Sequence, residues 1–265
     1  MPWPGSVWLA GPGRGTMTRM PRLLSAVLLV GTCWITAVQA QTVAPPGPIV
    51  VLAPHPDDET LGCGGLLATR AAEGRRIVVV VVTDGRALLR RFGIATAPSE
   101  VEVSRMRKAE TVRAVDILTR GRAEVVFLDV ENERLVAEQA ETTRRVTALL
   151  AELKPAELYV PSPFEGHAEH VATHAIATAA CAASGACDTI FEFIVTLKRG
   201  TELAALPRRQ VSVDVSAQRA VEREALQQFR SHLDVISPKL PTPFETDAYN
   251  RYLTAAEPFL VATPR

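Results

Sequence analysis

The chain has 265 residues, of which 47% are hydrophobic and 5% aromatic, and its 29 basic residues balance 29 acidic ones. This length is sufficient for one α/β domain with a large core. The balanced charge, without a basic stripe or a block of like charges, argues against a nucleic-acid-binding protein and against a charged disordered tail.

The first forty residues differ from the rest of the chain. Arg19 and Arg22 precede an apolar run over residues 23–38, and the run ends in Val-Gln-Ala just before Gln41. This pattern predicts a signal peptide that is cleaved after Ala40, so that the mature protein is periplasmic or secreted and not inserted in the membrane. The alternative is an uncleaved membrane anchor, although the run is shorter than the ~20 residues of a spanning helix.

The remaining organisation is simple. Within the predicted signal region, residues 1–40, the part before Met17 is interpreted as an upstream extension. Residues 41–48 are proline-rich and predict a linker. Residues 49–265 contain no internal repeat and predict one domain.

Three cysteines fall in the predicted mature part, and none forms a Cys-x-x-Cys pair. Cys181 and Cys187 are candidates for a disulfide in an oxidising compartment. Cys63 lies among glycines and is expected to be a small packing residue.

Strand-like and helix-like stretches alternate along the domain. Continuous apolar runs such as PIVVLAP and RRIVVVVVTDG are typical of strands that are buried on both faces. Strands are predicted over residues 48–54, 75–85, 123–130, 156–164, 190–199 and 208–216. Helices are predicted over residues 58–74, 99–121, 141–155, 168–183 and 216–233. The alternation predicts an α/β fold with right-handed crossovers and a mainly parallel sheet.

Polar residues follow the ends of several predicted strands. His55 to Asp58 follow the first strand, Asp84 follows the second, and His167 and His170 follow the fourth. Ligands of such a sheet bind beyond the carboxyl ends of its strands. The two histidine-bearing segments are therefore expected to meet at one rim, although more than a hundred residues separate them.

These residue types are suited to a catalytic zinc ion, Zn²⁺, which takes three protein ligands and leaves a position for water. His55, Asp58 and His170 would supply two imidazoles and a carboxylate. Asp57 could then accept a proton from water, and His167 could act as the acid or stabilise an oxyanion. The alternatives are structural: an N-cap formed by Asp57 or Asp58, and a solvated helix start at the histidine pair.

The motif PHPDDETLGCGG (54–65), followed much later by HAEH (167–170), resembles the LmbE-like/PIG-L de-N-acetylase family. The resemblance extends to TDG (83–85), RKAE (107–110) and REALQQFRSHL (223–233). It implies a Rossmann-like three-layer sandwich and a zinc-dependent hydrolase that removes acetyl groups from N-acetylated amino sugars or cleaves related amides. Carried over residue by residue, the resemblance gives zinc ligands at His55, Asp58 and His170, the base at Asp57 and the acid at His167.

The sequence departs from the family pattern in the second motif and after the third strand. Ala168 and Glu169 replace the usual Pro-Asp pair, and Glu169 is expected to support His167. An aspartate common after the third strand is replaced around Asn132, which suggests a different substrate. His174, one turn beyond the second motif, is either a spare ligand or a residue outside the ligand set.

Arg107 and Asp84 are the candidate substrate-binding residues, with a helix salt bridge between Arg107 and Glu110 as the alternative. The expected substrate is an N-acetylated saccharide or glycoconjugate: envelope glycan, exopolysaccharide or lipid-linked sugar. Two other functions stay open, a zinc amidase acting on a non-sugar amide conjugate and a non-catalytic protein that binds sugar or metal.

Overall fold

Two valine-rich strands form the centre of the sheet. The computed structural model describes residues 47–94, 98–187, 189–239 and 248–262. In it, β1 (Ile49–Ala53) and β2 (Ile77–Thr83) are buried along their whole length and pair in parallel. The predicted signal peptide and most of the predicted linker lie outside the described residues.

The other strands extend this pair into a seven-stranded sheet in the order β3-β2-β1-β4-β5-β7-β6. They are β3 (Ala123–Val130), β4 (Glu157–Pro161), β5 (Ile190–Phe193), β6 (Arg209–Asp214) and β7 (Ala256–Ala262). The first five strands in that order run parallel, and β7 pairs antiparallel with both β5 and β6. The predicted α/β class with a mainly parallel sheet is confirmed.

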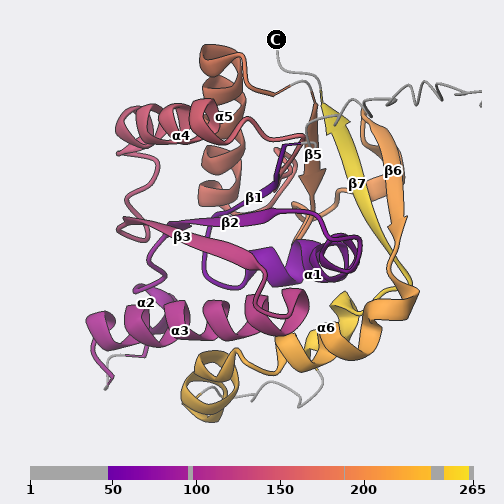
Figure 1. Cartoon of the computed structure of the whole chain (residues 1–265). Helices are drawn as coiled ribbons and strands as arrows, with labels where there is room; N and C mark the ends of the chain where they lie inside the picture. The colour runs from indigo at the N-terminus through magenta and orange to yellow at the C-terminus, as the bar shows by residue number, and fades with distance from the viewer. Residues whose placement is uncertain (1–46, 95–97, 188, 240–247, 263–265) are drawn as a thin grey trace, which may run out of the picture. The chain divides into compact units, whose positions relative to one another are not determined.

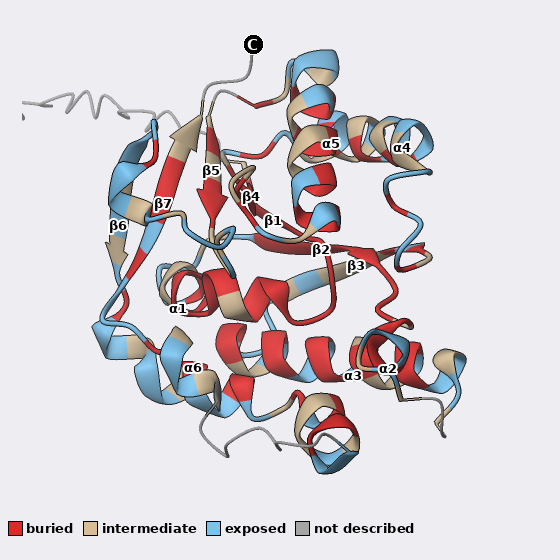
Figure 2. Cartoon of the chain, turned by 180° about the vertical axis from the view of Figure 1, so that it is seen from behind, coloured by how far each residue is buried: buried red, intermediate tan, exposed pale blue. Residues whose placement is uncertain are grey.

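Helices cover both faces of this sheet (Figure 1). They are α1 (Asp58–Ala72), α2 (Leu88–Arg91), α3 (Glu100–Thr119), α4 (Gln139–Leu153), α5 (Ala168–Ser184) and α6 (Arg219–Leu226). Alternate residues of β1 face opposite layers: Ile49 and Val51 pack with α1, α3 and α6, whereas Val50 and Leu52 pack with α4 and α5. The buried surfaces face the sheet (Figure 2), so the molecule is the predicted three-layer sandwich.

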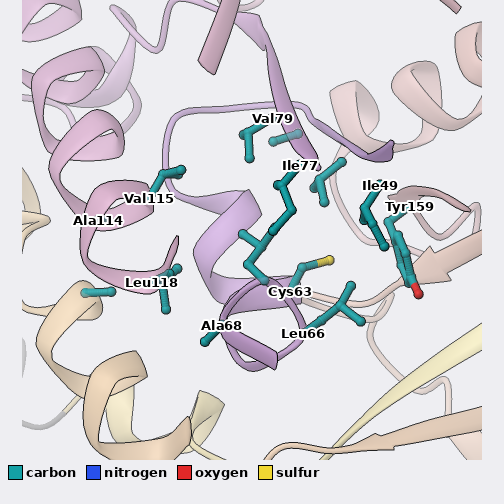
Figure 3. Packing of buried hydrophobic residues seen from close by; sticks show 14 of the residues in the cluster. Ile49, Cys63, Leu66, Ala68, Ile77, Val79, Ala114, Val115, Leu118 and Tyr159 are labelled. Atoms are coloured by element: carbon teal, nitrogen blue, oxygen red, sulfur yellow. The ribbon is translucent and has the colours of Figure 1, made fainter. Parts of the chain in front are cut away.

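The glycines of the first motif allow α1 to lie close to its neighbours. A Cβ atom on Gly62 would lie 2.3 Å from the Phe193 ring, and one on Gly65 would lie 2.5 Å from Cβ of Val215. Cys63 is fully buried in the same core cluster, shown in Figure 3, as expected for a packing residue. Its φ of −143° interrupts the helix, which restarts one residue later.

The C-terminal part differs from the sequence-based expectation. The predicted helix over 216–233 is wrong as a single helix, because α6 ends at Leu226 and a separate π-helical turn spans Ser231–Ile236. The break brings Phe229 into the core, where it is fully buried. The Glu110 carboxylate then accepts hydrogen bonds from the backbone N–H and hydroxyl of Ser231.

Two further differences concern short elements. The strand predicted over 190–199 stops at Phe193, and the segment after it turns across the rim of the sheet. Helix α2 and strand β7 were not predicted. Cys181 and Cys187 form a disulfide with Cα atoms 5.4 Å apart. Within the described ranges, no helix is long and apolar enough to cross a membrane.

Candidate active site

A cavity of about 420 Å³ opens at the carboxyl ends of the central strands. Strand β1 leads into it through His55 and the start of α1, and β4 leads into it through the loop before α5. Six of the seven predicted site residues line this cavity: His55, Asp57, Asp58, Arg107, His167 and His170. The expectation that the two motifs meet at one rim is therefore met by the fold.

One oxygen atom brings the three predicted ligands together. Oδ2 of Asp58 lies 2.9 Å from Nδ1 of His55 and 3.1 Å from Nε2 of His170. Ligand atoms about 2.0–2.1 Å from a tetrahedral zinc ion are separated by roughly 3.3 Å. The three side chains are buried and have the donor types of a zinc-ligand set, and Oδ2 of Asp58 lies at about that spacing from one nitrogen of each histidine.

His167 lies beside this set. Its ring centroid is 4.7 Å from that of His55 and 5.0 Å from that of His170. Nitrogen atoms of the three histidines all lie within 4.8 Å of one another. The geometry therefore lets either Asp58 or His167 complete a metal site with the other two histidines.

Opposite charges hold the side chains of this cluster together. Burial opposes ionisation of Asp58, but His170 and His55 hold the pKa of its carboxyl well below the ordinary value. Burial likewise opposes the charged form of His170, yet Asp58 raises the pKa of His170 to about 10. A cation that binds here replaces protons on the imidazoles, as is usual for metal sites.

Glu169 orients His55, not His167. Its Oε2 lies 2.9 Å from Nε2 of His55 and accepts a hydrogen bond of 2.6 Å from Nδ2 of Asn132. Only the backbone N–H of Glu169 contacts His167, to whose Nδ1 it donates. The expectation that the Glu169 side chain supports His167 is wrong, because its longer side chain reaches across to the first motif. A carboxylate behind a metal-ligating histidine fixes its tautomer and orientation.

Asp57 is held next to the ligands in a conformation rare for residues other than glycine, with φ of 132°. Its Oδ1 lies 3.0 Å from Nη2 of Arg107, and its Oδ2 lies 3.8 Å from Nε2 of His232. Burial raises the pKa of Asp57 to about 6, although Arg107 opposes the rise. A carboxylate with a pKa near neutrality is suited to general base catalysis.

Arg107 is tied to the base and not to Glu110. Its guanidinium also donates to the carbonyl oxygens of Pro56, at 2.5 Å, and Gly85, at 3.3 Å. The helix salt bridge considered as its alternative is wrong, since Glu110 binds Ser231. Arg107 remains at the cavity wall, where it can also contact substrate.

Asp84 does not line the cavity. Its carboxylate accepts from Nε of Arg86 at 2.5 Å and from the backbone N–H of Asn132 at 3.2 Å. Asp84 thus fixes the loops that follow β2 and β3, and the prediction that it contacts substrate is not supported by its position.

Of the two remaining histidines, one lies outside the cavity and the other lines it. His174 points to Glu192, with its Nε2 2.9 Å from Oε1, and is not in the cavity. Sequence reasoning missed His232, which lines the cavity with its Nε2 3.8 Å from Oδ2 of Asp57. Its place depends on the break after α6, which no periodicity in the sequence indicated. Arg91 and Arg199 were also missed: Arg91 ends the short helix α2, which was not predicted, and Arg199 lies after β5 in a segment predicted as strand.

Glu165 fixes the wall of the cavity behind His170. Its carboxylate lies 3.5 Å from Nδ1 of His170 and accepts hydrogen bonds from the backbone N–H groups of Val195 and Thr196. The segment after β5 is thereby attached to the start of α5. No pattern in the sequence predicted this contact.

Comparison with known proteins identifies a matching family model and several similar proteins. The family model described as "PIG-L: GlcNAc-PI de-N-acetylase" matches residues 50–181. A 1D-myo-inositol 2-acetamido-2-deoxy-alpha-D-glucopyranoside deacetylase from Rhodococcus jostii is 27% identical over 157 residues, 52% of this chain and 54% of that protein. A diacetylchitobiose deacetylase from Thermococcus kodakarensis is 27% identical over 128 residues, 46% of this chain and 44% of that protein. The chain thus spans about half the length of the curated relatives it matches.

Solved structures share the fold at low sequence identity. The N,N'-diacetylchitobiose deacetylase from Pyrococcus horikoshii has a TM-score of 0.63 at 16% identity, with 82% of this chain and 84% of that chain covered. A 4-carboxy-2-hydroxymuconate hydratase from Pseudomonas putida has a TM-score of 0.61 at 18% identity, with coverage of 83% and 97%. The fold alone therefore does not determine the reaction. Residues 50–181, which contain all three predicted ligands and the predicted base, belong to the PIG-L (LmbE-like) family.

Proposed function

We propose that the protein is a zinc-dependent hydrolase that removes the N-acetyl group from an N-acetylated amino sugar. The observation that carries this proposal is the contact of His55 and His170 with one oxygen of Asp58, directly beside Asp57 in an open cavity. The names of the relatives, which are deacetylases of acetamido sugars, support the same reaction class.

His55, Asp58 and His170 would hold the ion. Two imidazoles and one carboxylate match a catalytic zinc site, in which a fourth position stays open. When bound, zinc polarises a carbonyl group and makes a water molecule acidic near neutral pH. Glu169 and Glu165, behind the two histidines, would orient their rings.

Asp57 would act as the general base. It lies between the proposed ligands His55 and Asp58 in the chain, and its carboxylate is held by Arg107 at 3.0 Å, which fixes its direction. Asp57 takes a proton from the attacking water and returns it to the amide nitrogen. An amine leaves an amide readily only when its nitrogen gains a proton, so this second transfer is required.

His167 would donate a hydrogen bond to the reacting amide. Its Nδ1 accepts from the backbone N–H of Glu169 at 3.2 Å, so the ring hydrogen is on Nε2. That hydrogen would be donated to the oxyanion or to the leaving nitrogen in place of the contact that Nε2 makes with Arg91. His232, on the other side of Asp57, provides a second imidazole close to the base.

We further propose that the mature protein works outside the cytoplasm. The predicted signal peptide and the Cys181–Cys187 disulfide both support this location, since disulfides persist in oxidising compartments. An exported deacetylase meets envelope glycan, exopolysaccharide and lipid-linked sugars, which are therefore the proposed substrates.

The proposal is tested by measuring acetate and amine products from a panel of N-acetylated saccharides with metal-stripped and zinc-reconstituted protein. We expect acetate and a free amine on the sugar, both dependent on about one zinc ion per chain. Release of a larger acid from a conjugate would instead identify an amidase. Zinc-loaded protein that hydrolyses no amide in the panel but binds saccharides would overturn the proposed activity.

A further inference from the structure

Two arginines at the cavity mouth are not used by the proposed reaction. Arg91, at the end of α2, and Arg199, after β5, are both exposed and line the cavity. Neighbouring Arg90 forms ion pairs with Glu100 at 3.4 Å and Glu133 at 3.2 Å. Across the ranges that the structure describes, neither Arg91 nor Arg199 has such a carboxylate partner.

Arg91 also contacts His167, the residue proposed to donate to the reacting amide. The guanidinium Nη1 of Arg91 lies against Nε2 of His167, and Nδ1 of the same ring accepts from Glu169 N–H. Arg91 and His167 are therefore neighbours in the cavity, and an anionic group held by the Arg91 guanidinium would lie next to the His167 ring.

The charges around the cavity favour the same kind of ligand. Three arginines line it, and so do three carboxylates, those of Asp57, Asp58 and Glu165. Asp57 is paired with Arg107, and Glu165 accepts backbone hydrogen bonds inside the wall. A divalent ion on Asp58 would leave the mouth with an excess of positive charge, which attracts an anionic substrate.

We propose that Arg91 and Arg199 select an acetamido sugar that carries an anionic group, a phosphate or a carboxylate, near the acetamido substituent. This inference rests on the proposed deacetylase function and specifies its substrate class. The guanidinium group presents paired donors that match phosphate and carboxylate oxygens. Because Arg91 abuts His167, the anion would also orient the sugar with its amide at the base.

The test compares two matched substrate pairs on the zinc-loaded protein. N-acetylglucosamine 1-phosphate is compared with the methyl α-glycoside of N-acetylglucosamine, and N-acetylmuramic acid with N-acetylglucosamine. We expect kcat/KM to favour the anionic member of at least one pair by about tenfold or more, as for a hydrogen bond to a charged group. The pair that shows the preference identifies phosphate or carboxylate as the ligand.

Arg91→Gln and Arg199→Gln should each reduce that preference, mainly through KM for the anionic member. Arg90→Gln is the matched control, since Arg90 is exposed, adjacent and already paired, and it should leave the preference unchanged. Calorimetric titration of wild-type protein with the same sugars measures binding independently of turnover.

The outcomes separate the two proposals. Acetate release with equal kcat/KM for both members of each pair overturns the anion preference and leaves the deacetylase function intact. A preference that survives both arginine substitutions also overturns it, because the anion then binds the metal directly. Arginine-dependent binding of the anionic sugar without acetate release supports the anion site and contradicts the deacetylase function.

Discussion

Asp58 connects the two motifs through a single oxygen, which also accepts the backbone N–H of His55 at 3.0 Å. Removing any one of the proposed ligands leaves two of the three donors that a catalytic zinc site takes, and His167 replaces the missing donor only if it leaves its contact with Arg91. We expect His55→Ala, Asp58→Ala and His170→Ala each to lose most of the bound metal, measured by elemental analysis after dialysis. His174→Ala is the control and should keep its zinc, because His174 binds Glu192 instead. Full metal content in all three variants would refute this coordination.

Glu169 is one of the residues at which this chain departs from the family pattern, and its side chain contacts His55. Glu169→Gln retains the size but removes the carboxylate that orients the imidazole. We expect zinc affinity to fall about 10- to 100-fold, the usual effect of losing such a support, in competition titrations with a chelator. Glu133→Gln is the control, since only the backbone N–H of Glu133 contacts Glu169. Equal affinity in both variants would show that Glu169 does not orient the ligand.

At the scale of elements, the central strands were predictable because burial on both faces requires long apolar, β-branched runs such as Ile77–Thr83. Strand β7 was not, because it contains Pro258 and depends on antiparallel pairing with β5 and β6. The break after α6 could not be predicted for a similar reason. Packing of Phe229 in the core, and not the helical periodicity of the sequence, determines the backbone there.

The site likewise contains residues that local sequence predicts and residues that only tertiary packing places. The ligands and the base lie in two short motifs at strand ends, so their meeting followed from sheet topology. His232 lies in the π-helical turn after α6, Arg91 at the end of the short helix α2, and Arg199 in the segment after β5. Tertiary packing sets the place of these short elements, about which local sequence carries little information, so these residues could be found only in the structure.

Strand β7, helix α6 and the interrupted helix α1 meet at two buried acids. Glu257 accepts the N–H groups of Gly65 and Leu66 at 2.7 and 2.8 Å, where α1 restarts. Burial, together with Glu257, raises the pKa of Glu222 to about 8. A carboxyl group whose pKa is raised by folding stabilises the fold while protonated, and that stabilisation is lost as pH rises through the folded pKa.

We therefore expect the free energy of unfolding to fall between about pH 5 and pH 8 by on the order of 1 kcal/mol or more. Glu222→Gln should flatten this dependence, measured by urea denaturation at several pH values. Glu224→Gln, an exposed position on the same helix, should keep the wild-type dependence. A wild-type slope that persists in Glu222→Gln would show that another group causes it.

At the scale of the whole molecule, the disulfide and the proposed export make a joint prediction. The protein recovered from the producing cell should begin at Gln41 and should contain one free thiol, that of buried Cys63. After denaturation, thiol titration should find one cysteine without reductant and three with it. Replacing both Cys181 and Cys187 by Ser should cost about 2 kcal/mol, as estimated for such a short loop. A cytosolic protein beginning at Met17 would refute the export.

The central claim is hydrolysis by Asp57 beside a metal held by its neighbours, and Asp57→Asn tests it most directly. The change is nearly isosteric and removes the base without removing a ligand. Metal content and acetate release should be measured on the same preparations of wild-type and variant protein. We predict full zinc content with a rate reduced about a hundredfold or more, the scale of general base catalysis. A variant that keeps its zinc and a near-normal rate would contradict the proposed mechanism.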